Sequence, residues 1–573
     1  AAATQHDPAY STAFTARGNL TSVSRWDVND VNNAAKKLTS YSNYYTTGSP
    51  LSATDPAGHQ STIAYADSFS DGVNRNTFAY PTSITDAGGF ATLSKYNFDF
   101  GATTWRQTPA PNAGQAAPTQ TISYDSAARV QQITSNVNSA HTRWVYPPSH
   151  TSISTFTTIV NGLGEAFSGQ LFDGAGRLRA SSAEHPGSTG LYSGQSLIYD
   201  NMGRLVQQSN PNEITENWVP TGDDSAWIYT VQAYDWQGRP TLTTSPDGST
   251  RENVYGGCGC AGGEVTTIRD EQGRRRKLTK DVFGRLKQVD ELNWNQSVYA
   301  TTSYTYNVRD QLTNINQAGQ LRSFAYDGYG RLQTRTTPEQ GTTAYSYFAD
   351  DTVQTMTDAR GATRTFSYNN RHLVAGITYG VPAGVAATPN VMFAYDAAGN
   401  RTSMTDGLGS VSYAYDQLSR LTSETRTFAG VGSYALSYAY NLGNELTSIT
   451  NAWGATVGYG YDKVGRPTNV SGSGYAGVSS YVSSFAYRAF GLKQMSYSNG
   501  RTLSLQYDNR LRPTQWSIPG VLRMQYDYTW GTDGRVGFTR NLDDETLDRY
   551  YGYDQVGRLT VSRSGNEARL AIG

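Results

Sequence analysis

A short motif recurs along this chain and organises residues 393–421, FAYDAAGNRTSMTDGLGSVSYAYDQLSRL: Tyr-Asp, two further residues, Gly or Ser, and then a basic residue within one or two places. Aromatic residues stand two apart there, as in Phe393 and Tyr395, so each pair shares one face of a strand. The Asp after the second aromatic can hydrogen-bond to the backbone ahead of it, and the Gly supplies the positive φ that a short hairpin loop needs. Each copy of the motif therefore predicts one β-hairpin.

The motif repeats at intervals of 20 to 27 residues after Tyr304, and the last interval is double, with a degenerate copy at residues 530–536. The second aromatic of each unit falls at Tyr306, Tyr326, Tyr347, Tyr368, Tyr395, Tyr415, Tyr440, Tyr461, Tyr487, Tyr507 and Tyr553. The candidate structural motif residues are Tyr199, Asp200, Gly203, Arg204, Tyr234, Asp235, Gly238, Arg239, Tyr326, Asp327, Gly330, Arg331, Tyr395, Asp396, Gly399, Tyr415, Asp416, Tyr461, Asp462, Gly465, Arg466, Tyr553, Asp554, Gly557 and Arg558. A fixed period of this size indicates a repeat architecture.

The regularity of the motif divides the chain into three regions of one continuous architecture. Residues 1–215 carry irregular copies, residues 216–300 carry atypical copies around a Cys-Gly-Cys loop, and residues 301–573 carry the regular array. No amphipathic helical window of convincing length interrupts them. We therefore predict an all-β fold, a β-hairpin array that forms a long spiralling sheet, as a β-solenoid, a hollow shell or a tube.

Stacking explains the composition of the motif. A lone hairpin is marginal in water, but copies side by side make one wide sheet in which equivalent aromatics become cross-strand neighbours. The motif Arg can stack on a neighbouring ring or pair with the turn Asp. The opposite face carries small or hydroxylated residues and could line a water-filled space; these are Ala394, Ser412, Ala414, Ser437 and Ala439.

Charge and hydropathy exclude some partners. The net charge of −1 does not provide the positive charge that nucleic-acid binding needs. The mean hydropathy is −0.55, and no stretch of the sequence approaches the roughly 18 consecutive apolar residues of a membrane span. The one basic run, residues 274–277, is interpreted as a solvated strand face, with a polyanion contact as the alternative. No signal peptide is visible and the first residue is not Met, so we expect a piece of a longer protein.

No catalytic or cofactor motif stands out. The six histidines are far apart in the sequence, with no metal-like spacing: His6, His59, His141, His150, His185 and His372. Each motif turn offers one carboxylate, so we expect the Asp residues to cap turns and not to bind calcium. We therefore expect no enzyme, no cofactor and no metal.

The two cysteines, Cys258 and Cys260, are too few for a disulfide framework or a four-ligand zinc site. Residues 257–262 match Gly-x-Gly-x-x-Gly, but the strand-like sequence after them rules out a dinucleotide site, which needs a helix there. We interpret the segment as a tight Gly-rich loop, with a redox pair or a site shared between chains as alternatives.

The motif resembles the YD repeat of Rhs-family proteins, most closely at residues 326–332 (YDGYGRL) and 553–559 (YDQVGRL). That family includes bacterial Rhs polymorphic toxins, the shell-forming subunits of Tc toxin complexes and the extracellular part of animal teneurins. The resemblance covers nearly the whole chain. It implies a long β-ribbon that spirals into a hollow shell, which in toxin members encloses a C-terminal toxic domain released by self-cleavage.

One family feature is displaced. The family's array closes with an Asp-Pro-x-Gly signature and autoproteolytic aspartates, yet the one such signature here is at residues 55–58, near the wrong end. No protease residue is carried over, and residues 1–573 include no segment of toxin-like composition after the array.

We therefore expect a non-catalytic shell or scaffold segment of a large secreted or cell-surface bacterial protein that encloses or carries a toxic cargo. Its expected partners are its own flanking segments or further copies of itself, together with an encapsulated toxin domain. The alternatives are an extracellular tube or fibre built from repeat segments, and an adhesin whose aromatic side chains bind carbohydrate or protein.

Overall fold

The computed structural model describes residues 7–149, 151–223, 225–257, 264–528 and 534–567. Within them the chain forms 47 β-strands and three 3-10 helices, η1 (Pro8–Tyr10), η2 (Ala34–Lys36) and η3 (Glu545–Leu547). The all-β prediction is confirmed. Cys258 and Cys260 with their loop, His6, His150 and most of the degenerate copy at 530–536 lie outside the described residues.

The chain divides into two units, each built from two segments that are far apart in the sequence. Unit 1 comprises residues 1–143 and 322–454, and unit 2 comprises residues 144–321 and 455–573. The three-region division of the sequence follows motif regularity and not these units, and it stays a prediction.

The strands of unit 1 come in two series. The first series is β1 (Ser22–Trp26), β2 (Lys37–Tyr44), β3 (Pro50–Thr54), β4 (Gln60–Ala64), β5 (Ser83–Thr85), β6 (Ala91–Tyr96), β7 (Thr103–Gln107), β8 (Thr119–Tyr124), β9 (Val130–Ser135) and β10 (His141–Val145). The second is β26 (Gln320–Tyr326), β27 (Leu332–Thr337), β28 (Gly341–Tyr347), β29 (Val353–Thr357), β30 (Thr363–Tyr368), β31 (Val374–Gly380), β32 (Val391–Tyr395), β33 (Arg401–Asp406), β34 (Gly409–Tyr415), β35 (Leu421–Phe428), β36 (Gly432–Tyr440) and β37 (Leu446–Thr450).

Unit 2 also has two series. The first is β11 (Ser152–Thr158), β12 (Glu165–Phe172), β13 (Leu178–Glu184), β14 (Tyr192–Tyr199), β15 (Leu205–Ser209), β16 (Asn212–Ile214), β17 (Pro220–Thr221), β18 (Tyr229–Tyr234), β19 (Pro240–Thr244), β20 (Thr250–Gly256), β21 (Val265–Arg269), β22 (Arg275–Lys280), β23 (Leu286–Leu292), β24 (Val298–Tyr306) and β25 (Leu312–Gln317). The second is β38 (Thr456–Tyr461), β39 (Pro467–Ser473), β40 (Ser480–Arg488), β41 (Gly491–Tyr497), β42 (Thr502–Tyr507), β43 (Pro513–Ile518), β44 (Leu522–Asp527), β45 (Phe538–Asn541), β46 (Arg549–Tyr553) and β47 (Leu559–Ser564).

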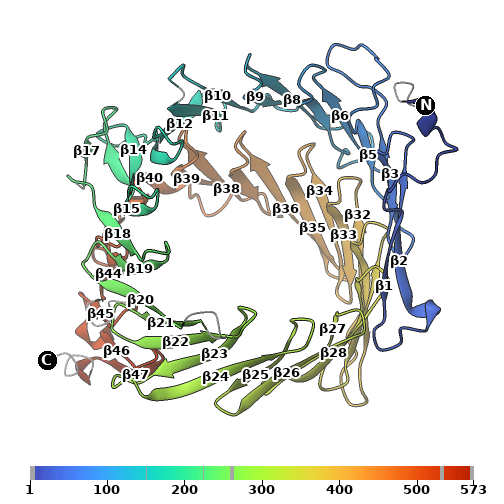
Figure 1. The fold of residues 1–573 in the computed structure, drawn as a ribbon. Helices are drawn as coiled ribbons and strands as arrows, with labels where there is room; N and C mark the ends of the chain where they lie inside the picture. The colour runs from blue at the N-terminus through green and yellow to red at the C-terminus, as the bar shows by residue number, and fades with distance from the viewer. Residues whose placement is uncertain (1–6, 150, 224, 258–263, 529–533, 568–573) are drawn as a thin grey trace. The chain divides into compact units, whose positions relative to one another are not determined.

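Consecutive strands pair antiparallel, as β32 to β36 do in unit 1 (Figure 1). The register shifts by one residue at each motif Tyr: Ala394 is opposite Ser403, whereas Tyr395 is opposite Arg401. The same shift occurs at Tyr199, Tyr234, Tyr415 and Tyr553. A β-bulge of this kind bends the strand and increases its right-handed twist. The repeat therefore contains a regular source of curvature.

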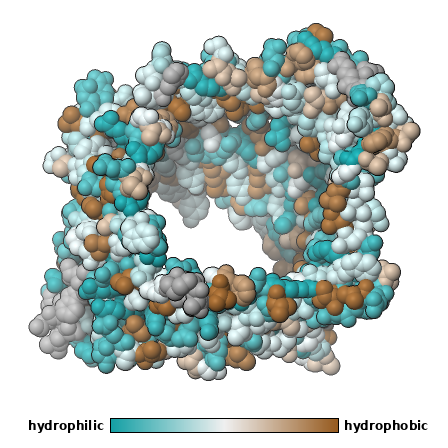
Figure 2. Space-filling view, in the orientation of Figure 1, coloured by the Kyte–Doolittle hydropathy of each residue, from teal (hydrophilic) through white to brown (hydrophobic). Residues whose placement is uncertain are grey.

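The sheet is stabilised with few fully buried side chains. On β34, Val411 is buried and Tyr413 and Tyr415 are half-buried, while Ser412 and Ala414 between them are exposed. In the described residues, the buried hydrophobic side chains that pack directly together are Tyr65 and Phe78. Hydrophobic residues accordingly form small separate groups among polar ones on the face drawn in Figure 2. Cross-strand contacts between neighbours therefore replace a large common core.

The two segments of each unit meet through their turns. In unit 1 the Tyr329 hydroxyl donates to the Lys36 carbonyl at 2.5 Å, which places β1 and β2 beside β27 and β28 (Figure 1). In unit 2 the Lys463 amine lies 2.6 Å from the Glu184 carboxylate. The described residues include no helix with the length and apolar character of a membrane-spanning segment.

Candidate functional site

The repeated feature of this structure is the motif turn, the five residues Asp-x-x-Gly-Arg that follow each motif Tyr. In the copy that begins at Asp200, Oδ1 accepts hydrogen bonds from the N–H groups of Met202 and Arg204, both at 2.9 Å. The Asp200 N–H donates to the Arg204 carbonyl at 3.0 Å and closes the loop. The fourth position has φ between 81° and 91° in Gly203, Gly238, Gly330, Gly399, Gly465 and Gly557, a region that other residues enter at a cost.

The motif Arg joins one repeat to the next. The Arg204 Nε donates to Asp200 Oδ2 in its own turn at 2.7 Å. Its guanidinium carbon lies 5.1 Å from the centre of the Tyr234 ring in the following repeat, and its Nη1 donates to the Asp235 carbonyl there at 2.9 Å. The Arg-over-Tyr contact recurs at Arg177–Tyr199, Arg331–Tyr347, Arg420–Tyr440 and Arg466–Tyr487, at 4.6–5.2 Å. The Arg thus makes both contacts suggested by the sequence.

The motif Tyr completes this joint. The Tyr234 hydroxyl donates at 2.7 Å to the carbonyl of Leu205, the residue that follows the motif Arg of the preceding repeat. The same bond joins Tyr199 to Leu178, Tyr306 to Leu286, Tyr347 to Leu332, Tyr440 to Leu421, Tyr507 to Leu492 and Tyr553 to Val536. We call the Asp–Arg pair, the ring of the next Tyr and this hydrogen bond the repeat joint.

A further joint fills the double interval in the sequence. The Tyr528 hydroxyl donates to the Pro513 carbonyl at 2.9 Å, and the Arg512 guanidinium lies 4.6 Å from the Tyr528 ring centre. Tyr528 therefore takes the aromatic position that the sequence analysis left empty. Tyr526 and Tyr528 stand two residues apart, as the paired aromatics of the motif do, and this spacing is the sequence signal that could have identified the copy.

The joints hold their titratable groups in fixed protonation states at neutral pH. The backbone N–H of Arg204, and its guanidinium, outweigh burial and lower the pKa of Asp200. Burial raises the pKa of motif tyrosines such as Tyr347, Tyr415 and Tyr553. Both shifts move the groups away from pH 7, so these carboxylates and phenols serve as acceptors and donors and are poor general acids or bases.

The two variable positions of the motif turn connect the segments within a unit. In unit 1 the Gln417 side chain donates to the Ala116 carbonyl at 2.7 Å. In unit 2 the Arg510 guanidinium lies 3.3 Å from the Glu271 carboxylate, and the Gln555 amide donates to the Asn293 side chain at 3.2 Å. The backbone geometry that the turns share thus builds the ribbon, while the side chains at their variable positions hold one segment against another.

Other variable positions of the earlier segment in unit 2 are exposed and apolar. Trp236 is 87% exposed, Met202 and Phe283 are 77% and 74% exposed, and Val308 is fully exposed. A line of exposed apolar side chains on several turns is a feature of interaction surfaces.

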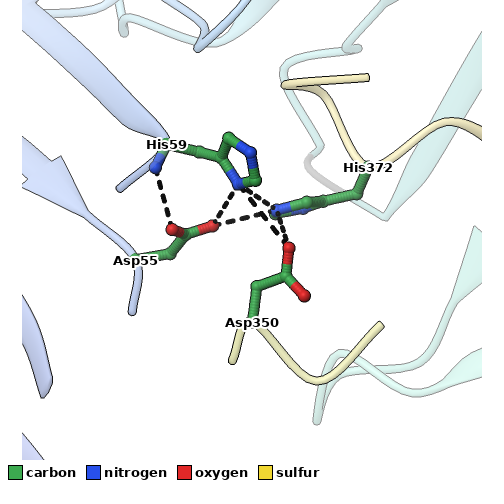
Figure 3. A group of neighbouring side chains, drawn as sticks. All are labelled: Asp55, His59, Asp350 and His372. Carbon is green, nitrogen blue, oxygen red and sulfur yellow. Dashed lines mark hydrogen bonds and ion pairs between the residues drawn. The ribbon is translucent and has the colours of Figure 1, made fainter. Parts of the chain in front are cut away.

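Four side chains in unit 1 form a separate cluster, Asp55, His59, Asp350 and His372 (Figure 3). Asp55 Oδ2 lies 2.8 Å from His59 Nδ1 and 2.9 Å from His372 Nε2. Asp350 Oδ2 lies 3.4 Å from His372 Nε2 and 3.6 Å from His59 Nδ1, and the two ring nitrogens are 3.2 Å apart.

Sequence spacing did not predict this cluster. The histidines are far apart in the sequence and each turn offers a single carboxylate, yet the fold brings two histidines and two carboxylates together. Although Asp55 is partly buried, which acts to raise its pKa, hydrogen bonds from the His59 N–H and from both imidazoles keep that pKa below its usual value. The sequence signal was a His in two motif turns, at positions that Arg and Gly otherwise occupy.

The hairpin array, its bulges and its repeat joints define a YD-repeat β protein. Residues 233–428 match the family model of the teneurin YD-shell. The resemblance to the YD-repeat family drawn from the sequence is confirmed by this match.

Solved structures share the fold. The crystal structure of TcdB2-TccC3 is similar with a TM-score of 0.75 and 13% identity, over 95% of this chain and 32% of that one. The Photorhabdus luminescens Tc holotoxin pore, with a TccC3 variant, has the same TM-score and identity over 93% of this chain and 33% of that one. This chain thus spans about a third of the length of those chains. A comparison with curated proteins gave no match.

Proposed function

We propose that this chain is a non-catalytic segment of a YD-repeat shell, part of a large secreted or cell-surface bacterial protein that encloses or carries a toxic cargo. The observation that carries the proposal is the repeat joint. The polar groups of the motif close each turn or fasten it to the next hairpin, so the repeated chemistry supports the building of a wall.

The face opposite the aromatic side chains supports a role as a lining. Ser412, Ala414 and Ala439 on this face are exposed to solvent, small and uncharged. Small, uncharged side chains of this kind tolerate contact with water and offer little area for binding an enclosed chain tightly. It suits a wall that holds a cargo without fixing it.

The exposed apolar line in unit 2, formed by Met202, Trp236, Phe283 and Val308, supports the partner proposal. Equivalent turn positions in the later segments contact another stretch of the ribbon, as Gln417 does. We propose that a flanking segment of the parent chain, or a further copy, covers this line.

Protease protection tests enclosure. The native parent protein is treated with protease, and fragments of the cargo are followed by mass spectrometry before and after the shell is unfolded by denaturant. Enclosure predicts a cargo that resists cleavage until the shell unfolds. Cleavage of the cargo at the rate of the isolated cargo domain would contradict enclosure, while leaving the fold of the wall unaffected.

The second candidate is a tube or fibre built from repeat segments, which the same exposed line favours because exposed apolar side chains invite association with another copy. Light scattering across a wide concentration range distinguishes it. Open-ended growth supports the fibre, whereas a monodisperse monomer at every concentration contradicts it. An adhesin would instead use exposed aromatics such as Trp236, and would lose glycan or cell binding when they are replaced.

A further inference from the structure

Three turns of unit 1 depart from the motif at the place where they meet. His59 stands at the fifth position of its turn, where most copies have Arg, and hydrogen-bonds to Asp55 as the Arg would. His372 stands at the fourth position, where most copies have Gly, with φ of 60°. Asp350 occupies a variable position of the third turn. The left-handed conformation is unfavourable for His relative to Gly, so the imidazole of His372 is placed there against the local preference.

Five of the six separations are close to the edges of a tetrahedron around one ion. Zinc binds nitrogen and oxygen ligands at about 2.0–2.1 Å, and a tetrahedron of that size has edges of about 3.3 Å. The five separations given above, between Oδ2 or ring nitrogen atoms, run from 2.8 to 3.6 Å. All four ligand atoms lie within 4.8 Å of one another.

Burial and charge also favour a cation. The Asp350 side chain is 4% exposed. Its Oδ1 accepts hydrogen bonds from the N–H and hydroxyl of Thr352, at 3.0 and 2.6 Å, while its Oδ2 is directed at the two imidazoles. Two carboxylates converge in this partly buried site, where their negative charge is unfavourable unless a cation compensates it.

One divalent ion would satisfy both carboxylates and both imidazoles together.

The ligand set selects the kind of ion. Two imidazole nitrogens and two carboxylate oxygens suit zinc and its transition-metal neighbours, whereas calcium takes six to eight oxygen ligands. A neighbouring open cavity of about 510 Å³, lined by Asp55, His59 and His372 among others, offers a route for entry.

We propose that Asp55, His59, Asp350 and His372 bind one divalent transition-metal ion of the zinc type. The ion fastens the turn after β3 to the turns after β28 and β30, segments of unit 1 that are about 300 residues apart in the sequence. It would oppose separation of the two segments, because a link between distant residues removes loop-closure entropy from the opened state. The proposal does not depend on whether the chain encloses a cargo.

The test uses the whole chain, stripped of metal by a chelator, with Zn²⁺ and Co²⁺ as probes. Calorimetry measures zinc affinity and stoichiometry, and visible absorption of bound Co²⁺ reports tetrahedral coordination. His372→Gly removes a ligand and restores the motif glycine, so the turn keeps its backbone. Ala128→Gly is the matched control, since Ala128 has φ of 60° at the same position of another unit 1 turn and lies outside the cluster.

The proposal predicts one zinc per chain, a tetrahedral cobalt spectrum and a zinc-dependent rise in the unfolding temperature for the unmodified chain and for Ala128→Gly. His372→Gly should bind zinc at least about tenfold more weakly and lose the tetrahedral spectrum. His59→Arg, which restores the motif residue at a second ligand, should do the same. Failure of the unmodified chain to bind either ion, or equal zinc affinity in His372→Gly and Ala128→Gly, would overturn the proposal.

Discussion

Arg420 offers the sharpest test of the repeat joint. Its Nε donates to Asp416 at 2.7 Å, its Nη1 donates to the Asn441 carbonyl at 2.8 Å, and its guanidinium lies 5.2 Å from the Tyr440 ring centre. A charge-assisted hydrogen bond contributes about 1.5–3 kcal/mol, a cation–π contact about 0.5–1 and a partly exposed ion pair up to about 1. Because these terms overlap, we expect Arg420→Ala to lower the free energy of local unfolding by about 2–4 kcal/mol.

Hydrogen exchange is the suitable assay, since repeat proteins open locally. The affected amides should be those of β36 and β37, the strands on either side of the turn that Arg420 fastens. At about 1.4 kcal/mol for each factor of ten, their exchange should be about 30- to 700-fold faster in Arg420→Ala.

Arg360→Ala is the matched control. Arg360 pairs with Asp358 of its own turn at 2.7 Å, but its side chain is 75% exposed, against 19% for Arg420. An exposed pair of this kind contributes little, so the change should stay below about 0.5 kcal/mol. Equal effects of the two substitutions, or an Arg420→Ala effect spread evenly over unit 1, would refute the role of the joint. In a double-mutant cycle, Arg420→Ala and Tyr440→Leu should couple by about 0.5–1 kcal/mol.

Three further predictions concern other parts of the motif. Tyr440→Phe removes the hydroxyl that donates to the preceding repeat and should cost about 0.5–1.5 kcal/mol in the free energy of unfolding; a neutral result by hydrogen exchange would count against that bond. Gly238→Ala should lower the free energy of unfolding by denaturant by about 1–2 kcal/mol, because its φ is 82° and Ala is unfavourable there even though the added Cβ meets no other atom. Gly174→Ala, at a position without a positive φ, should be nearly neutral. Stability should also fall at both ends of the pH range. Motif aspartates have lowered pKa values when folded, so their contribution is full above the unfolded value of about 4 and is lost as the pH falls through the folded value. Burial and a hydrogen bond to a carboxylate raise the pKa of Tyr438 to about 12, so its contribution is full below about pH 10 and is lost as the pH rises towards 12. Circular dichroism across pH checks this, and a flat profile at either end would contradict it.

Local chemistry explains how much of the fold and the joint could be predicted. The Asp–Arg pair and the left-handed Gly lie within five residues, so their spacing alone specifies them. The stacking of Arg on the next Tyr needs only the repeat period. The hydroxyl-to-carbonyl bond escaped prediction because it depends on the register across a β-bulge, where one extra residue shifts the pairing.

The His and Asp cluster could not be predicted in the same way. His59 and His372 meet because the two segments of unit 1, residues 1–143 and 322–454, lie against each other although they are far apart in the sequence. That proximity depends on the accumulated twist of the strands between them, a quantity that no local pattern states. The sequence does show two departures from the motif, His59 at a position where most copies have Arg and His372 at a position where most have Gly. Only the structure shows that these two turns lie next to each other.

The most direct measurement of the central claim is electron microscopy of the native parent protein, imaged without crosslinking. A wall made of this ribbon predicts discrete hollow particles, with density for a cargo inside them. Continuous tubes or fibres would contradict the enclosing role and establish the repeat as an assembly module.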